Sequence, residues 1–237
     1  YWLRNFTGSE LSADVKFRST GKYAYLLNPE NGSGAEIEIK NGSAKLLLSP
    51  SDAVFVILTD SKIDNLKPLI KYNKNVSQKL LGHWKVDFKQ IGSVEISKTF
   101  DTLHSWTEES EQEVKYYSGT AVYSCDFEVS KTVLGLSKEF RLNLGQVKNI
   151  AEIFINGRAA GVLWKSPFIS SDIKPLLMAG KNKLEVRVTN LWVNRMIGDR
   201  QPGIERPITS VRRFYTAHDP LLPSGLLGPV RLEGMIY

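Results

Sequence analysis

The sequence predicts an all-β protein that consists of antiparallel β-sandwich sections. Short segments rich in β-forming residues recur at intervals of about 8 to 12 residues, separated by Gly, Asn, Ser and Pro. Asn-Gly pairs such as those at residues 41–42 and 156–157 stand between such segments and are typical of tight hairpins. Only residues 171–178 have a helical pattern, with Ser170 or Ser171 as the candidate N-cap and Gly180 beyond the C-terminal end.

The first section contains five expected strands. Apolar and charged residues alternate strictly over residues 35–40, which predicts a strand with one buried face, and Asn41-Gly42 then turns the chain into its partner. Residues 53–58 are apolar throughout, as in a strand covered on both faces, although a buried helical turn has the same pattern over so few residues. The expected strands are residues 13–17, 23–27, 35–40, 44–48 and 53–59.

The regular pattern disappears over residues 60–82, where lysines and asparagines dominate, and we expect the domain boundary there. The division predicted is a small β-sandwich section at residues 1–80 and a jelly-roll sandwich at residues 81–237. The second section has expected strands at residues 84–88, 94–100, 119–129, 140–144, 150–155, 160–164, 183–189 and 230–237.

The most strongly specified segment of the chain is residues 151–164. Strand alternation leads into Asn156-Gly157, which favours a primed turn, and continues to Trp164 on the other side. The segment therefore predicts a β-hairpin. We expect Trp84 and Trp164, which lie in strand patterns, to pack in the core.

No strand pattern is present over residues 191–227, and so long an irregular segment is typical of a functional or docking loop. Its arginines and aromatic residues suit recognition of carboxylates or sugars, because guanidinium groups donate several hydrogen bonds and aromatic faces stack. Alternatively, the arginines pair with Asp199, Glu205 and Asp219 and merely pin the loop. Trp106 also lies in loop-like sequence and is added to these residues. The candidate carbohydrate-binding or docking residues are Trp106, Trp192, Arg195, Asp199, Arg200, Arg212 and Tyr215.

Composition excludes several classes of protein. The net charge of +6 over 237 residues comes from dispersed lysines without a nucleic-acid-binding motif, so no nucleic acid partner is expected. No apolar run reaches the roughly 18 to 20 residues of a membrane helix. The single Cys125 forbids an intrachain disulfide and suggests an inert buried thiol, and three dispersed histidines give no local zinc motif. The absence of an initiating Met suggests a fragment of a longer chain.

The residues assign no catalytic group. A glycosidase needs two carboxyl groups that face each other. Pairs such as Glu108 with Asp199 or Glu205 with Asp219 can always be drawn among 25 carboxylates, and the sequence does not show that any pair converges. There is no G-x-S-x-G elbow and no phosphate-binding loop. No cofactor is expected apart from a structural calcium, which backbone carbonyls and one Asp could hold without any spacing pattern.

Several segments resemble known carbohydrate enzymes. The Asn156-Gly157 hairpin, the Pro167-Phe168 step, Asp172-Ile173 and residues 180–186 (GKNKLEV) are similar to the galactose-binding-like jelly roll of glycoside hydrolase family 2. A narrower resemblance, to the C-terminal region of bacterial family 106 α-L-rhamnosidases, lies in residues 106–108 (WTE), 116–123 (YYSGTAVY), 192–199 (WVNRMIGD) and 224–232 (SGLLGPVRL). In the first section, residues 26–29 (LLNP) and 49–56 (SPSDAVFV) look like the tail of a preceding β domain.

The resemblance implies that the catalytic carboxylates lie in an upstream barrel and that the protein is periplasmic or extracellular. The expected function is therefore a non-catalytic C-terminal accessory region of a polysaccharide-degrading glycoside hydrolase. Its expected partner is carbohydrate or the upstream catalytic domain of the same chain, with no membrane partner. An independent carbohydrate-binding module is the alternative.

Overall fold

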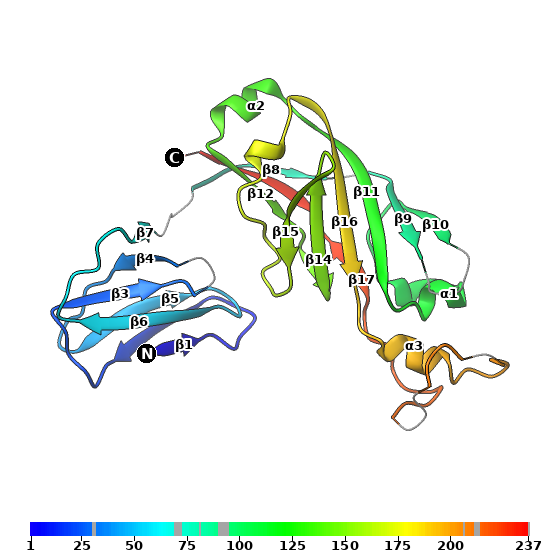
Figure 1. Cartoon of the computed structure of the whole chain (residues 1–237), viewed down its shortest axis with the longest axis horizontal. Coiled ribbons are helices and arrows are strands. Elements are labelled where there is room, and N and C mark those ends of the chain that lie inside the picture. Colours follow the sequence, from blue (N-terminus) through cyan, green and yellow to red (C-terminus); the bar gives the residue numbers. More distant parts are fainter. Residues whose placement is uncertain are drawn as a thin grey trace. The chain divides into compact units, whose positions relative to one another are not determined.

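The computed structural model describes residues 1–29, 32–68, 73–80, 82–89, 95–205, 207–210 and 214–236. The chain divides into two compact units, Tyr1–Lys71 and Tyr72–Tyr237 (Figure 1). This boundary lies before the expected division at residues 80 and 81. The difference arises because strand β8 (Asn73–Lys79) pairs with β18 (Arg231–Ile236), the last strand of the second unit.

The first unit is a small sandwich of two sheets. One sheet has five strands in the order β1-β6-β3-β4-β7, and the other pairs β2 with β5. Its core includes Phe17, Leu46 and Val56. The strands are β1 (Trp2–Arg4), β2 (Leu11–Lys16), β3 (Tyr23–Leu27), β4 (Ser33–Glu36), β5 (Ser43–Leu48), β6 (Ala53–Thr59) and β7 (Lys67–Pro68).

The expectations for the first unit meet different outcomes. The tight turn at Asn41-Gly42 is confirmed: these residues have φ of 51° and 75°, and the backbones of Lys40 and Ser43 exchange two hydrogen bonds of 2.9 Å. The strand expected at residues 35–40 is wrong, because β4 ends at Glu36 and pairs with β3 and β7, whereas β5 pairs with β2. The expectation that β6 is covered on both faces is wrong. Val56 is buried, whereas Phe55 on the opposite face is exposed, so β6 buries one face only.

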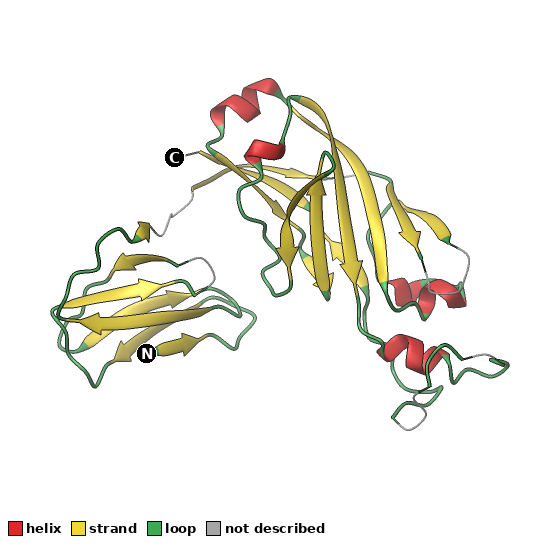
Figure 2. Cartoon of the chain, in the orientation of Figure 1, coloured by secondary structure: helices red, strands yellow, loops and turns green. Residues whose placement is uncertain are grey.

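The second unit is a larger sandwich. A six-stranded sheet in the order β10-β9-β11-β16-β14-β15 packs against a three-stranded sheet, β12-β18-β8, and a pair, β13-β17 (Figure 2). Its strands, besides β8 and β18, are β9 (Trp84–Phe88), β10 (Ile96–Phe100), β11 (Thr120–Val129), β12 (Glu139–Asn143), β13 (Gln146–Lys148), β14 (Ile150–Ile155), β15 (Arg158–Leu163), β16 (Gly180–Thr189) and β17 (Gly225–Gly228).

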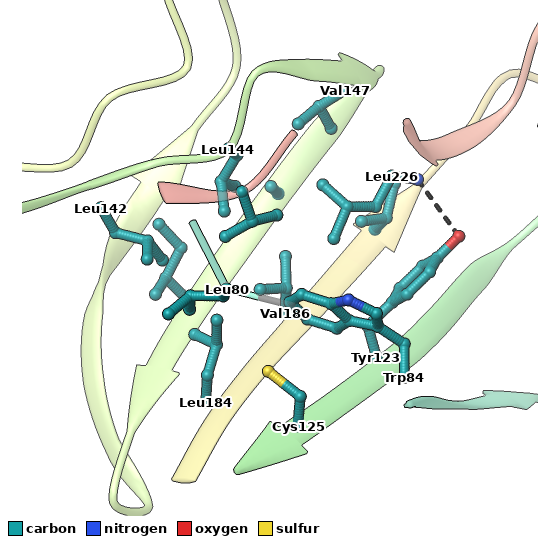
Figure 3. Close-up of a cluster of buried hydrophobic side chains, with 14 of the residues drawn as sticks. Leu80, Trp84, Tyr123, Cys125, Leu142, Leu144, Val147, Leu184, Val186 and Leu226 are labelled. Atoms are coloured by element: carbon teal, nitrogen blue, oxygen red, sulfur yellow. Dashed lines mark hydrogen bonds between the residues drawn. The ribbon is translucent and has the colours of Figure 1, made fainter. Parts of the chain in front are cut away.

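The core of the second unit lies between these sheets (Figure 3). Trp84, Cys125 and Leu184 are among its buried side chains, as the strand alternation predicts. The hydroxyl of Tyr123 also lies inside and accepts a hydrogen bond of 3.1 Å from the Leu226 backbone N–H. The prediction of an all-β sandwich is confirmed.

The β14–β15 hairpin is confirmed, with φ of 53° at Asn156 and 77° at Gly157. The Asn156 side chain also joins the turn to the neighbouring chain. Its amide donates to Leu176 O and Asn182 Oδ1, each at 2.9 Å, and its carbonyl oxygen accepts from the Lys183 backbone N–H at 2.9 Å. The hairpin tip is thereby fixed to β16.

The expected helix at residues 171–178 is reduced to a 3₁₀ turn, η2 (Lys174–Leu176). The candidate cap Ser170 instead serves β12, since its Oγ accepts from Leu142 N at 2.9 Å. Asp172 Oδ1 accepts from both Phe140 N of β12 and Lys174 N of η2, each at 2.9 Å. The helices that do form were not predicted: η1 (Trp106–Glu108), α1 (Gln112–Lys115), α2 (Lys131–Leu136) and α3 (Val193–Gly198). Within the described residues, none of the helices is long and apolar enough to cross a membrane.

Candidate functional site

The candidate site is the segment of residues 191–227, which we call the α3 segment. It leaves the end of β16, forms α3, continues through irregular chain and enters β17 (Figure 1). Helix α3 has only six residues, and its N-cap residue Trp192 makes no side-chain capping hydrogen bond. Tertiary contacts rather than helix capping therefore fix its position.

Two buried asparagines fix the α3 segment to the sandwich. Asn194 donates to Leu222 O at 2.7 Å and to Ser224 Oγ at 2.9 Å, and accepts from Leu222 N at 2.8 Å. Asn190 donates to Tyr117 O at 2.8 Å and to Ser224 Oγ at 3.1 Å. These bonds hold both ends of the segment together. The α3 segment is therefore a closed excursion on the end of the sandwich.

Trp106, an expected sugar-binding residue, is a core residue instead. Its side chain is completely buried, packs edge-on against Phe88 and Tyr117, and donates through Nε1 to the hydroxyl of Tyr123. A ring without exposed surface cannot stack on a sugar, which corrects the expectation. Gly225 makes room for the ring, because a Cβ there would lie 2.5 Å from Trp106 Nε1.

Arg195 and Asp199 come together within α3, but they face inward. Nε and Oδ1 lie 2.9 Å apart, with 9% and 2% of the side chains exposed. These two atoms form an ion-pair contact without the alignment of a hydrogen bond. The arrangement matches the pinning interpretation of the sequence and leaves neither side chain open to a ligand.

Asp199 also holds the irregular chain after α3. Its Oδ2 accepts from the backbone N–H and the hydroxyl of Thr209, both at 2.7 Å. Burial alone would raise the pKa of Asp199, but these hydrogen bonds and the charge of Arg195 outweigh it and lower the pKa below its ordinary value. The carboxylate therefore stays ionised as a structural acceptor.

The remaining expected site residues differ in exposure. Trp192 is 49% exposed, whereas Arg200 and Tyr215 are partly buried. Arg212 lies outside the described residues. Sequence reasoning emphasised charged residues and missed the apolar character of the surface. The exposed large apolar side chains of the α3 segment are Leu191, Trp192, Ile204, Ile208, Phe214 and Leu222.

A second polar cluster lines a crevice of about 480 Å³ beside the edge strand β10. Lys98 pairs with Glu109 and, at 3.0 Å, with Glu111. His104 Nε2 lies 2.7 Å from Glu109 Oε1, and its Nδ1 lies 2.8 Å from Thr102 O. The bonds attach residues 102–111 to the edge of the sheet.

Hydrogen bonding sets the protonation of this cluster. Both ring nitrogens of His104 face acceptors, which the doubly protonated ring satisfies best. Burial opposes the charged ring, but the bonds to Thr102 O and Glu109 outweigh it and raise the pKa of His104. Burial likewise opposes ionised Glu109, yet Lys98 and His104 lower its pKa.

Metal binding receives no geometric support from acidic or imidazole side chains. Among the described residues, no group of three or more His, Cys, Asp or Glu side chains is arranged to hold a metal ion. A calcium ion bound mainly by backbone carbonyls stays a prediction.

Asp219 is one of the carboxylates considered for catalysis. Its carboxylate accepts a hydrogen bond of 3.1 Å from the hydroxyl of nearby Thr216, a local bond that is typical of turns.

Part of the second unit is similar to a known family of domains. Residues 108–205, which contain the β14–β15 hairpin and α3, match the model "Glycosyl hydrolases family 2, sugar binding domain". A protein of Formosa agariphila named "Putative beta-glucuronidase" is 38% identical over 193 aligned residues, covering 69% of this chain and 16% of that protein.

Solved structures extend the likeness to the whole chain. The rhamnosidase from Novosphingobium sp. PP1Y matches 98% of this chain with a TM-score of 0.80 and 34% identity, and this chain spans 22% of it. A β-glucuronidase from Ruminococcus gnavus shares the fold over 70% of this chain, with a TM-score of 0.51 and 19% identity; the chain spans 30% of it. The chain thus spans under a third of each of these proteins.

Proposed function

We propose that this chain is a non-catalytic accessory region of a polysaccharide-degrading glycoside hydrolase of the α-L-rhamnosidase type, family 106. The supporting observation is the likeness to the Novosphingobium rhamnosidase, which extends over both units of this chain but over only 22% of that enzyme. In this proposal the region lies at the C-terminal side of the catalytic domain, which supplies the catalytic carboxylates. Its main partner is that domain.

The Novosphingobium rhamnosidase and the Formosa protein named as a β-glucuronidase, both above 30% identity, carry the names of different sugars. We propose rhamnose as the sugar because the rhamnosidase matches 98% of this chain. The sugar-binding domain model matched by residues 108–205 supports a role with carbohydrate in either case. A glycoside hydrolase of this kind requires two suitably placed carboxyl groups. In the α3 segment, Asp199 is instead buried against Arg195 and Thr209.

We further propose that the α3 segment contacts the catalytic domain and borders its sugar site. Trp192 and Phe214 in this segment are 49% and 79% exposed, whereas its Arg195–Asp199 pair is buried. Exposed apolar residues clustered on one short segment are typical of an interaction surface. The buried asparagine and arginine bonds hold that surface in a defined shape before the partner binds.

The test uses a glycoside hydrolase that carries this region. Removal of the region is expected to abolish activity on an aryl α-L-rhamnoside or to prevent folding of the enzyme. In the intact enzyme, Trp192→Ala is expected to lower kcat/KM at least about tenfold, or about 1.4 kcal/mol. Trp2→Ala, a substitution of another exposed tryptophan, 58% exposed in the first unit, is the control. Full activity of the truncated enzyme would refute the proposal.

The alternative is an independent carbohydrate-binding module, which the exposed Trp192 ring favours. Such a module would bind oligosaccharides by itself, and Trp192→Ala would abolish that binding. Calorimetry on the isolated chain distinguishes the two. Oligosaccharide binding that Trp192→Ala abolishes would support the carbohydrate-binding module. Oligosaccharide binding that persists in Trp192→Ala would not support a module centred on Trp192.

A further inference from the structure

A second exposed aromatic surface lies on the six-stranded sheet, at the end from which β16 leads into the α3 segment. Trp164 was expected in the core, but its side chain is 68% exposed, which corrects that expectation. Val162, two residues before it, and Ile150 of β14 are also exposed. We call Ile150, Val162 and Trp164 the outer-face patch.

Strand register places the patch on the outer face of the six-stranded sheet. Val162 pairs with Glu152, and the pairing of β14 with β15 ends at Ala151 and Leu163. Trp164 follows directly after β15, and continuing the same register by one residue would place it across from Ile150, on the face opposite the buried Ala151. The three side chains are therefore neighbours on one surface.

Polar groups with fixed positions surround the patch. Arg187 lies across from Glu152 on the neighbouring strand β16. Its Nε donates to Glu185 at 2.8 Å, and its guanidinium carbon lies 4.3 Å from the centre of the Phe154 ring. A side chain restrained by both a carboxylate and a ring loses less freedom when it binds a ligand.

The hydroxyl groups of Thr120 and Thr189 add a further pair of donors and acceptors. They lie 2.7 Å apart on adjacent strands, and Thr189 pairs with Ile150. The Trp164 ring is thus accompanied on this sheet by the hydroxyl, guanidinium and carboxylate groups of the neighbouring strands. This combination offers both an apolar face and directed hydrogen bonds.

The composition of this face fits a sugar better than another protein. A stable protein interface buries about 800 Å² on each partner, and charged residues are depleted at its centre. Here three apolar side chains adjoin Glu152 and Arg187, with further charges at Glu185 and Asp126 on the same sheet. A sugar ring has an apolar C–H face and a rim of hydroxyls, which matches such mixed surroundings.

We propose that the outer-face patch binds a polysaccharide chain, with Trp164 stacked on one sugar ring and Arg187 and Glu152 bonded to its hydroxyl groups. The ligand class rests on the proposed function. The location does not, because it is argued from the exposure and register of β14, β15 and the residue that follows β15, and not from the rings of the α3 segment. The accessory region would in this way hold the polymer while the α3 segment contacts the enzyme.

The experiment uses the 237-residue chain and rhamnogalacturonan I, a soluble polysaccharide that contains rhamnose and a uronic acid. Affinity gel electrophoresis measures retardation at increasing polysaccharide concentration. We expect the wild-type chain to be retarded, Trp164→Ala to weaken binding at least about tenfold, and Trp164→Phe to retain part of it. Trp2→Ala is the matched control, because Trp2 is 58% exposed in the other unit, and should change affinity less than about twofold.

Two outcomes would overturn the inference. One is no retardation of the wild-type chain, or retardation that Trp164→Ala leaves unchanged. The other is concentration-dependent self-association in sedimentation velocity that Trp164→Ala removes, which would identify the patch as a protein interface. Neither result touches the docking proposal, since that proposal depends on Trp192 and on activity of the intact enzyme.

Discussion

The hydroxyl of Ser105 accepts a hydrogen bond of 3.0 Å from the backbone N–H of Ser224, across 119 residues of sequence. The Trp106 backbone N–H completes the link by donating to Ser224 O at 3.1 Å. Ser224 also binds Asn190 and Asn194 through its hydroxyl. One small residue therefore joins η1, the end of β16, α3 and the start of β17. The surface proposed to meet the enzyme is attached at this point.

The first prediction concerns this junction. Asn194→Ala removes three hydrogen bonds and leaves the backbone groups of Leu222 without their partner. We expect a loss of about 2 to 3 kcal/mol in the free energy of unfolding of the second unit, because each buried unpaired group costs about 1 to 3 kcal/mol. Urea titration followed by tryptophan fluorescence measures it. Trp192→Ala, an exposed neighbour, should cost under about 1 kcal/mol, and equal costs for the two variants would contradict the account.

The second prediction concerns Gly225. It has φ of 102°, and an added Cβ would meet Trp106 Nε1 at 2.5 Å and Tyr123 Oη at 2.7 Å. Gly225→Ala is therefore expected to cost more than about 3 kcal/mol, since it combines backbone strain with a core overlap. Gly161→Ala is the matched control. Its φ is 124°, but nothing lies within 4 Å of the added Cβ, so strain acts alone and the cost should stay near about 1 to 2 kcal/mol.

The third prediction is a pH dependence centred on His104. Its raised pKa means that its contribution to stability is fully present below the unfolded value, about 6.5, and is lost as pH rises through the folded value. The lowered pKa of Glu109 acts in the other direction: its contribution is present above the unfolded value, about 4.3, and is lost as pH falls through the folded value.

Urea unfolding at pH 5.5 and at pH 8.5 tests the His104 contribution. His104→Gln should destabilise the protein more at pH 5.5 than at pH 8.5. Glu109→Gln should reduce that difference, because it removes the main side-chain partner of the ring. A cost of His104→Gln that is the same at both values, or larger at pH 8.5, would show that folding does not raise the pKa of His104.

The fourth prediction concerns Cys125. Burial, with a smaller effect of the Asp126 charge, raises the pKa of its thiol to about 12. The thiolate is the reactive form, so a thiol reagent such as Ellman's reagent should not label the native chain at pH 8 within the time that labels the urea-unfolded chain completely. Rapid stoichiometric labelling of the native chain would contradict the burial of this residue.

Local sequence signals were sufficient for two Asn-Gly turns, for the β14–β15 hairpin and for most strands. Asn41-Gly42 and Asn156-Gly157 adopt the positive φ angles that the residue types favour. Strand β8 was missed because its residues, NKNVSQK, have no apolar alternation, and its pairing with β18 bridges distant sequence. Helix α3 was missed because six residues without a side-chain cap have no distinct pattern.

The candidate site was less predictable because exposure depends on tertiary packing. Trp106 lies in loop-like sequence yet is buried, since Gly225 leaves space for its ring. Trp164 lies at the end of a strand pattern yet is exposed, since it follows β15 at the edge of the sheet on the outer face. Arg195 and Asp199 carry the charges of a ligand site but use them on each other. Residue type alone could not distinguish these cases.

The account depends most on the absence of hydrolytic activity in this chain, and its direct test is an assay of the purified 237-residue protein. The substrates are 4-nitrophenyl α-L-rhamnoside and 4-nitrophenyl β-D-glucuronide, which match the sugars named in the relatives. The predicted result is release of 4-nitrophenol at the rate of the buffer blank with both substrates. Turnover above the blank that co-purifies with the chain and disappears when an acidic residue of the chain is replaced by its amide would contradict it.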